Sequence, residues 1–217
     1  PVRVGVEHAY MLELQFKKEV AFPKALEEHW KATFNLYNPE VLEVDNEDVM
    51  NYGLEVLDRY WLKDNDAPGF PFSVHLPSGE VNEISYSMGF VGMQIPCAYY
   101  LYRKGLETNN PIYTDKGEQI LYFWAENSSA LNGMPRIWWD ISPWNFFRNH
   151  NDLRNMQGGL EAMILAWSHA EKHFPGSKTN WLDYCRRSAD WMVSRQHADG
   201  SWDKAFDNGG TSIDSGK

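Results

Sequence analysis

Residues 153–196, LRNMQGGLEAMILAWSHAEKHFPGSKTNWLDYCRRSADWMVSRQ, decide the fold of this chain. In the first half of this stretch, apolar side chains recur every three or four residues, which predicts an amphipathic helix. The second half begins at Thr179 or Asn180, both good N-caps, and its apolar residues align with helical spacing to about Gln196. The stretch therefore predicts two helices joined by a short turn, an αα-hairpin.

The same pattern occurs twice earlier in the chain. Helix pairs are expected to begin near Pro23, Ile84 and Asp152, roughly 60 to 70 residues apart, which is a period typical of stacked helical repeats. Short turns separate the helices of a pair, and long loops at 63–83, 127–151 and 197–217 follow the pairs. All three long loops are expected to emerge on one face, so candidate site residues are sought there.

Several element boundaries follow from local signals. The third helix is expected from about Ile84 to Leu106, where the sequence is apolar on nearly all sides, with a kink at Pro96. The fourth helix is expected from near Thr114, and residues 72–76 are expected to form a short hairpin. Alternation of apolar and polar residues over 2–17 predicts strand. The predicted domains are 1–20, a β prelude or the tail of a preceding β-domain, and 21–217, the helical hairpins.

Composition limits the classes of partner. Aromatic residues make up 15% of the 217 residues, with 10 Trp and 11 Tyr, so some rings are expected to face a ligand. The formal net charge of −10 repels phosphate backbones and anionic lipid, so neither nucleic acid nor a membrane is an expected partner. The two cysteines are expected to be free core thiols. Metal-ligand spacings and phosphate-binding glycine loops do not occur, so no cofactor is expected, and the cellular location stays open.

The segment DWMVSRQHADGSW, residues 190–202, resembles the helix end and Asp-Gly-Ser-Trp corner of α/α-toroid families. Together with the repeat, it makes the chain similar to the six-hairpin glycosidase superfamily over roughly residues 23–202. This resemblance implies an all-α fold, an α/α-hairpin toroid, whose loops between hairpins form the active face. A full ring has six hairpins and about three are expected here, so we expect a partial ring from a longer protein. The β element at the N-terminus agrees with the β-sandwich that precedes many such rings.

The same corner matches the Gln-x-x-x-Gly-x-Trp element of terpene cyclases. Those enzymes also need an acidic initiator motif, which this sequence lacks. A terpene-type cyclase is therefore kept only as a distant alternative.

Glycosidic cleavage needs a protonated carboxyl and a second carboxylate. Asp140 is the first candidate, because the rings of Trp138 and Trp139 are expected to desolvate its carboxyl and favour the protonated acid. Asp140 alternatively caps the turn that follows it. Glu83 is the second candidate, and its alternative role is that of a first-turn acid favoured by the helix dipole.

Other residues of the long loops are expected to bind substrate. The candidates for stacking on sugar rings are Trp138, Trp139, Trp144 and Trp202, although some of them are expected to fill the core. Arg148 is expected to bind a carboxylate-bearing sugar, and Asp203 and His150 complete the set.

These residues favour a glycoside hydrolase acting on an oligo- or polysaccharide. His150, with Tyr86 and Arg148, would also suit a polysaccharide lyase, which abstracts a proton beside a uronate carboxylate. A non-catalytic glycan-binding or structural segment is the alternative from another class.

Overall fold

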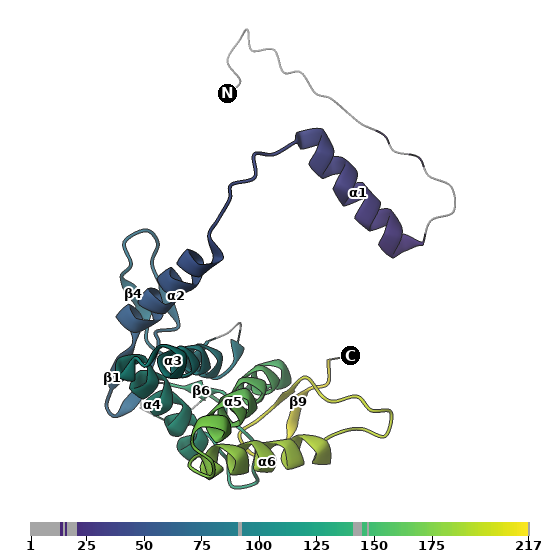
Figure 1. The fold of residues 1–217 in the computed structure, drawn as a ribbon. Helices are drawn as coiled ribbons and strands as arrows, with labels where there is room; N and C mark the ends of the chain where they lie inside the picture. The colour runs from purple at the N-terminus through teal and green to yellow at the C-terminus, as the bar shows by residue number, and fades with distance from the viewer. Residues whose placement is uncertain are drawn as a thin grey trace, which may run out of the picture. The chain divides into compact units, whose positions relative to one another are not determined.

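The computed structural model describes residues 14, 16, 21–90, 93–140, 145–146 and 148–216. The chain divides into two units, Pro1–Asp45 and Asn46–Lys217, and each is described by itself (Figure 1). The first unit holds α1 (Phe22–Tyr37), with Pro23 in its first turn and Asn38 as a left-handed C-cap, which confirms these two helix boundaries. Apart from residues 14 and 16, the predicted N-terminal β element lies outside the described residues and stays a prediction, as does the pairing of α1 with the next helix.

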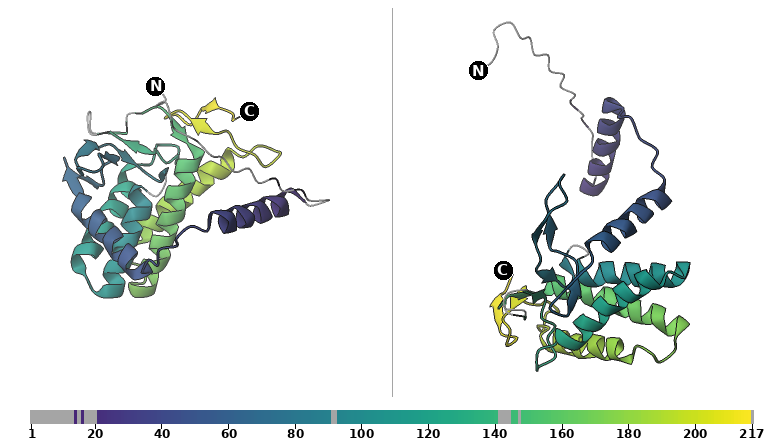
Figure 2. Two further views of the ribbon diagram at one scale, coloured as in Figure 1. Left: turned by 90° about the horizontal axis from the view of Figure 1, so that it is seen from above. Right: turned by 90° about the vertical axis from the view of Figure 1, so that its left-hand side faces the viewer.

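The second unit contains α2 and two consecutive αα-hairpins. Its helices are α2 (Asn46–Tyr60), α3 (Gln94–Thr108), α4 (Pro111–Asn127), α5 (Leu153–His173) and α6 (Thr179–Ser194). Helix α3 packs against α4 and α5 against α6, and the hairpins lie side by side through α3–α5 and α4–α6 contacts (Figure 2). The mostly helical fold and these two hairpins are confirmed, whereas a closed toroid stays a prediction. None of the helices in the described ranges is long and apolar enough to cross a bilayer.

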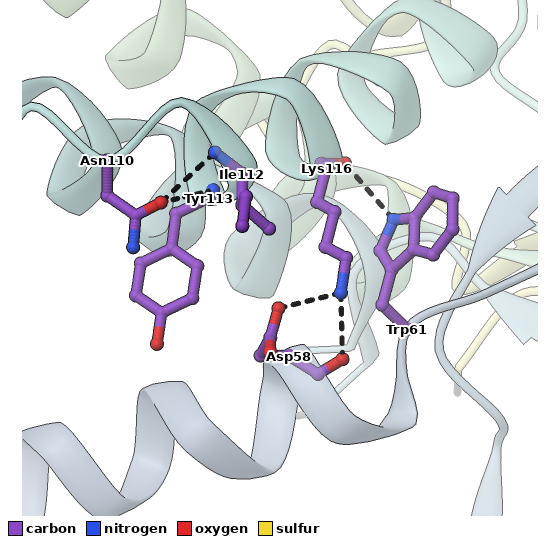
Figure 3. A network of polar contacts seen from close by, with 6 residues as sticks. All are labelled: Asp58, Trp61, Asn110, Ile112, Tyr113 and Lys116. Carbon is purple, nitrogen blue, oxygen red and sulfur yellow. Dashed lines mark hydrogen bonds and ion pairs between the residues drawn. The ribbon is translucent and has the colours of Figure 1, made fainter.

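Capping side chains set the starts of two helices. The Asn110 side chain accepts hydrogen bonds from the backbone N–H groups of Ile112 (3.0 Å) and Tyr113 (3.4 Å), so α4 begins at Pro111 rather than near Thr114 (Figure 3). Asp152 caps α5 by accepting from the backbone N–H of Asn155 at 2.8 Å. The predicted start of the third hairpin at Asp152 is therefore confirmed.

The predicted third helix is wrong over residues 84–90 and at Met93. Tyr86–Ser87 form strand β5, and α3 begins only at Gln94. Pro96 lies in the first turn of α3, where backbone N–H groups have no intrahelical acceptor, so it causes no lost hydrogen bond and no kink. Tyr100 is exposed, so α3 is not buried on every side.

The core of the second unit lies between the two hairpins. Its largest fully buried side chains include Trp124, Trp181 and Tyr184. Both cysteines are free thiols; burial raises the pKa of Cys97 to about 11 and that of Cys185 to about 12. Cys185 is buried and Cys97 partly so, which agrees with the prediction of unpaired core thiols.

In the described residues of the second unit, nine short strands gather at one end of the helices (Figure 2). The antiparallel pairs are β1 (Leu62–Asp64) with β2 (Ala67–Gly69), β3 (Ser73–Val74) with β4 (Val81–Glu83), β5 with β6 (Trp138–Trp139), and β8 (Ala205–Phe206) with both β7 (Asn151–Asp152) and β9 (Ser212–Asp214). The β5–β6 pair joins the first long loop to the second, and β7–β8 joins the second to the third. The three loops therefore lie together, as the sequence predicted.

Candidate active site

One guanidinium group brings two candidate carboxylates together. Arg148 Nε donates a hydrogen bond to Asp140 Oδ1 at 2.8 Å, and Arg148 Nη2 donates to Glu83 Oε1 at 3.1 Å and to Ser85 Oγ at 3.2 Å. Glu83 and Asp140 come from different long loops, which meet because β5 pairs with β6. Glu83, Asp140 and Arg148, chosen separately from the sequence, thus form one cluster.

The indole ring of Trp138 forms one wall of this cluster. Arg148 Cζ lies 4.2 Å from the centroid of that ring, in cation–π contact. The Phe72 ring packs against Trp138 with centroids 5.2 Å apart. These contacts fix the plane of the guanidinium group. We call Glu83, Ser85, Trp138, Asp140 and Arg148 the Arg148 cluster.

Glu83 is held as a carboxylate. The hydroxyl group of Ser85 donates to Glu83 Oε1, and this bond, followed by the hydrogen bond and charge of Arg148, lowers the pKa of Glu83 below its ordinary 4.5. Glu83 lies at the end of β4, eleven residues before α3 begins, so the predicted role as a first-turn helix acid is wrong. The residue suits the part of a base or nucleophile and not that of a proton donor.

Asp140 has one bonded and one unbonded carboxylate oxygen. Its side chain is 14% exposed, and Oδ1 is paired with Arg148 where the sequence predicted only apolar rings. Oδ2 is buried and has no hydrogen-bond partner within the described residues. The Asp140 backbone exchanges hydrogen bonds with Asn145 at 3.0 and 3.1 Å. Residues 141–144 lie outside the described residues, so the alternative role of Asp140 as a turn cap stays a prediction.

The other predicted ring residues are used differently. Trp139 points away from Trp138, as neighbours on a strand do, and packs edge-on against Phe123 and Phe146 with both centroid distances at 5.1 Å. It fills space beside the core. Trp144 lies outside the described residues, so its role as a stacking platform stays a prediction.

Residues of the third loop form a separate polar site. Trp202 Nε1 donates to the backbone oxygen of Met192 at 2.8 Å, and Asp203 Oδ1 lies 3.3 Å from His197 Nε2.

The two residues considered for a lyase, His150 and Tyr86, differ in burial. His150 is exposed. Tyr86 is fully buried, its hydroxyl donates to the Ala67 carbonyl at 3.1 Å, and burial raises its pKa. Tyr86 is therefore unsuited to the base role of a lyase.

Sequence reasoning missed the amides that anchor the loops. Asn151 accepts from the backbone N–H of Ile137 at 3.1 Å and donates to Asn208 Oδ1 at 2.9 Å. Asn155 accepts from the backbone N–H of Gly89 at 2.6 Å and donates to Ser87 Oγ at 2.8 Å. Their signal in the sequence was two asparagines beside the start of an apolar helix. These bonds hold the second loop against the first and third.

Arg136, another arginine of the second long loop, supports the backbone. Its Nη2 donates to the Asn127 carbonyl at 2.9 Å, and its guanidinium packs 4.6 Å from the Phe146 ring centroid. Burial lowers its pKa. Within the described ranges, no group of three or more His, Cys, Asp or Glu side chains is arranged to hold a metal ion.

Comparisons with known proteins reveal a likeness of fold. No protein-family model and no curated protein match the chain. Nine chains of solved structures match, among them the crystal structure of unsaturated glucuronyl hydrolase specific for heparin, with a TM-score of 0.51 and 13% sequence identity. The match covers 72% of this chain and 42% of that one, so the chain spans less than half of the matched structure's length. At this identity the likeness concerns the fold alone.

Proposed function

We propose that the chain is part of a glycoside hydrolase and that the Arg148 cluster is its active site. The observation that carries this proposal is the convergence of Glu83 and Asp140, from two loops, on the single guanidinium of Arg148. A pair of carboxyl groups is what glycosidic cleavage requires. The fold likeness to a glucuronyl hydrolase supports the same reaction class. By the resemblance and this likeness, the hairpins would belong to an α/α toroid.

The two carboxyl groups have different surroundings and would take different roles. Glu83, whose pKa is lowered, would act as the base that activates water or as the nucleophile. Asp140, the other carboxyl group of the pair, would then be the proton donor to the leaving oxygen. The division rests on Glu83, whose carboxylate is held ionised by Ser85 and Arg148.

Arg148 would select the substrate. Its Nε and Nη2 atoms bond to protein groups, whereas Nη1 has no partner within the described residues. A free N–H group beside the exposed part of Trp138 suits a sugar ring that carries a carboxylate, which can stack on the indole and bond to the guanidinium. We therefore propose a saccharide with a uronate unit as substrate.

The test is turnover of uronate-containing disaccharides, followed by the release of reducing ends. Asp140→Asn and Glu83→Gln should each lower kcat about 10²-fold to 10⁴-fold, as expected for loss of a general acid or base. Glu80→Gln is the matched control, because Glu80 lies in the same loop as Glu83 and is exposed. Equal turnover by Asp140→Asn and the parent protein would overturn the assignment.

One observation favours a non-catalytic glycan-binding segment as the second candidate. Arg148 already pairs with both carboxylates, as in a purely structural ion-pair network. If this candidate is right, the parent protein releases no reducing ends, while Trp138→Ala weakens glycan binding. Ultraviolet absorbance from newly formed unsaturated uronates would instead identify a lyase.

A further inference from the structure

The Asp-Gly-Ser-Trp corner is a rigid turn held by its own hydrogen bonds. Gln196 Nε2 donates to the Gly200 carbonyl at 2.9 Å, and Asp199 Oδ1 accepts from the backbone N–H of Ser201 at 2.9 Å and from its hydroxyl at 2.6 Å. Because Asp199 is used within the turn, the corner's own carboxylate is not a site. The residues that this turn positions are its neighbours, His197 and Asp203.

These neighbours line a cavity of about 410 Å³ between the C-terminal end of α6 and the loop that joins β8 to β9. Its lining includes Arg195, His197, Asp203, Phe206, Thr211 and Ser212. The volume lies in the range of small-molecule sites, and the lining is mainly polar. We call it the α6 cavity, and it shares no residue with the Arg148 cluster.

The loop that forms the far wall of the α6 cavity is also fixed. Asp207 Oδ1 accepts from the backbone N–H groups of Gly209 at 2.9 Å and Thr211 at 2.8 Å. Gly210 has a φ of 80° and lies against Trp191, where a Cβ atom would be crowded. The wall therefore keeps its shape before any ligand arrives.

The two charged side chains Asp203 and Arg195, which line the α6 cavity, differ in whether they have a partner of opposite charge. The Asp203 carboxylate is paired with His197, at 3.3 Å. The Arg195 guanidinium packs 5.6 Å from the Trp191 ring centroid and has no carboxylate partner in the part of the chain that the structure describes. An arginine that is stacked on an indole and lacks an acid is well placed to bind an anionic group.

We propose that the α6 cavity binds a sugar unit that carries an anionic group. Arg195 would bind the anion, and Asp203 and Thr211 would bond to hydroxyl groups of the ring. The site lies beside the active face, because β8 pairs with β7, which follows the loop that contains Arg148. The binding does not require turnover, so this proposal and the hydrolase proposal can fail separately.

The test uses the Asp140→Asn protein, in which turnover is expected to be about 10²-fold to 10⁴-fold slower, and follows backbone amide resonances of Gly209, Gly210 and Thr211. Sodium glucuronate should shift these resonances with saturation, whereas glucose and inorganic sulfate should bind at least about tenfold more weakly, because each lacks one of the two recognised features. Site-specific resonances separate this cavity from binding at Arg148.

Arg195→Ala should weaken glucuronate binding at these resonances by about tenfold or more, and Arg195→Lys should restore part of it. Arg186→Ala is the matched control, since Arg186 is an exposed arginine of α6, the helix that Arg195 directly follows, and does not line the cavity. Unchanged binding by Arg195→Ala, or sulfate binding as tight as that of glucuronate, would overturn the proposal.

Discussion

The two ends of the hairpin helices are built differently. At one end, short turns join α3 to α4 and α5 to α6, and the polar groups are local and exposed, as with the Asn110 cap and the Arg103–Glu107 pair. At the other end, three long loops meet, and polar side chains such as Asn151 and Asn155 are 1% exposed. We call these the turn end and the strand end.

The difference shows how irregular loops can carry a precise site. Long loops are costly to order, and the strand end orders them with buried amides that bond across segments far apart in sequence. The Arg148 cluster and the α6 cavity both lie at this end. If the comparison is right, single changes at the strand end cost more stability than changes at the turn end.

The largest effect is expected for Gly89→Ala. A Cβ atom at Gly89 would collide with the backbone of Asn155 and Gly159 on α5, and neither backbone can move without shifting the helix. We expect the free energy of unfolding to fall by about 3 kcal/mol, measured by urea denaturation. Gly53→Ala is the control: nothing lies within 4 Å of its new Cβ, so α2 should gain about 0.5–1 kcal/mol. If Gly89→Ala left the free energy of unfolding unchanged, the strand end would not be more sensitive to single changes than the turn end.

The helices of the second unit could be predicted because their signals are local. Apolar spacing and the Asp152 cap are readable within one turn of chain. Residues 84–90 were misassigned because a short apolar run fits a buried strand as well as a helix, and periodicity alone does not separate them. The strand β5 forms because Tyr86 pairs with Trp139, which is 53 residues away in sequence. No local sequence pattern contains that pairing.

The members of the Arg148 cluster could also be predicted, but their contacts could not. Residue type and loop position suggested Glu83, Asp140 and Arg148 one by one. That Arg148 bonds to both acids, and that Ser85 bonds to Glu83, depends on the β5–β6 register. The predicted apolar surroundings of Asp140 were therefore incomplete, because the nearest group proved to be a cation.

The second-largest effect is expected for Asn155→Ala. The change leaves the buried backbone N–H of Gly89 without its acceptor and removes the donor to Ser87. We expect a loss of about 2 kcal/mol in unfolding free energy, the typical cost of a buried unsatisfied group. Gln157→Ala, at an exposed position on the same helix, should change stability by less than about 0.5 kcal/mol. A cost for Asn155→Ala as small as this control would mean that the amides do not anchor the loops.

Asn110→Ala tests how much a single change at the turn end lowers the free energy of unfolding. The side chain caps two backbone N–H groups at the start of α4, and both bonds are near the surface, where water can replace them. We expect a loss of about 1 kcal/mol, and less for Asn110→Ser, which keeps a capping oxygen. Thermal unfolding of both variants beside Asn155→Ala tests the ranking. A cost for Asn110→Ala that exceeds that of Asn155→Ala would reverse the comparison.

The smallest effect is expected for Asp58→Asn, whose partner Lys116 lies in the first half of α4, the half nearer the turn end. Lys116 Nζ lies 2.6 Å from Asp58 Oδ1 and 3.1 Å from its backbone oxygen, and Lys116 also packs 5.4 Å from the Trp61 ring centroid (Figure 3). The Asp58 side chain is 39% exposed, so solvent screens the pair, and Lys116 keeps its backbone and ring contacts without the carboxylate. We expect a loss of about 0.5 kcal/mol or less in unfolding free energy, shrinking further in high salt. A loss of unfolding free energy above about 1.5 kcal/mol that does not depend on salt would mean that this half-exposed ion pair stabilises the protein as much as a buried amide does. The stability of the two ends would then not follow their burial.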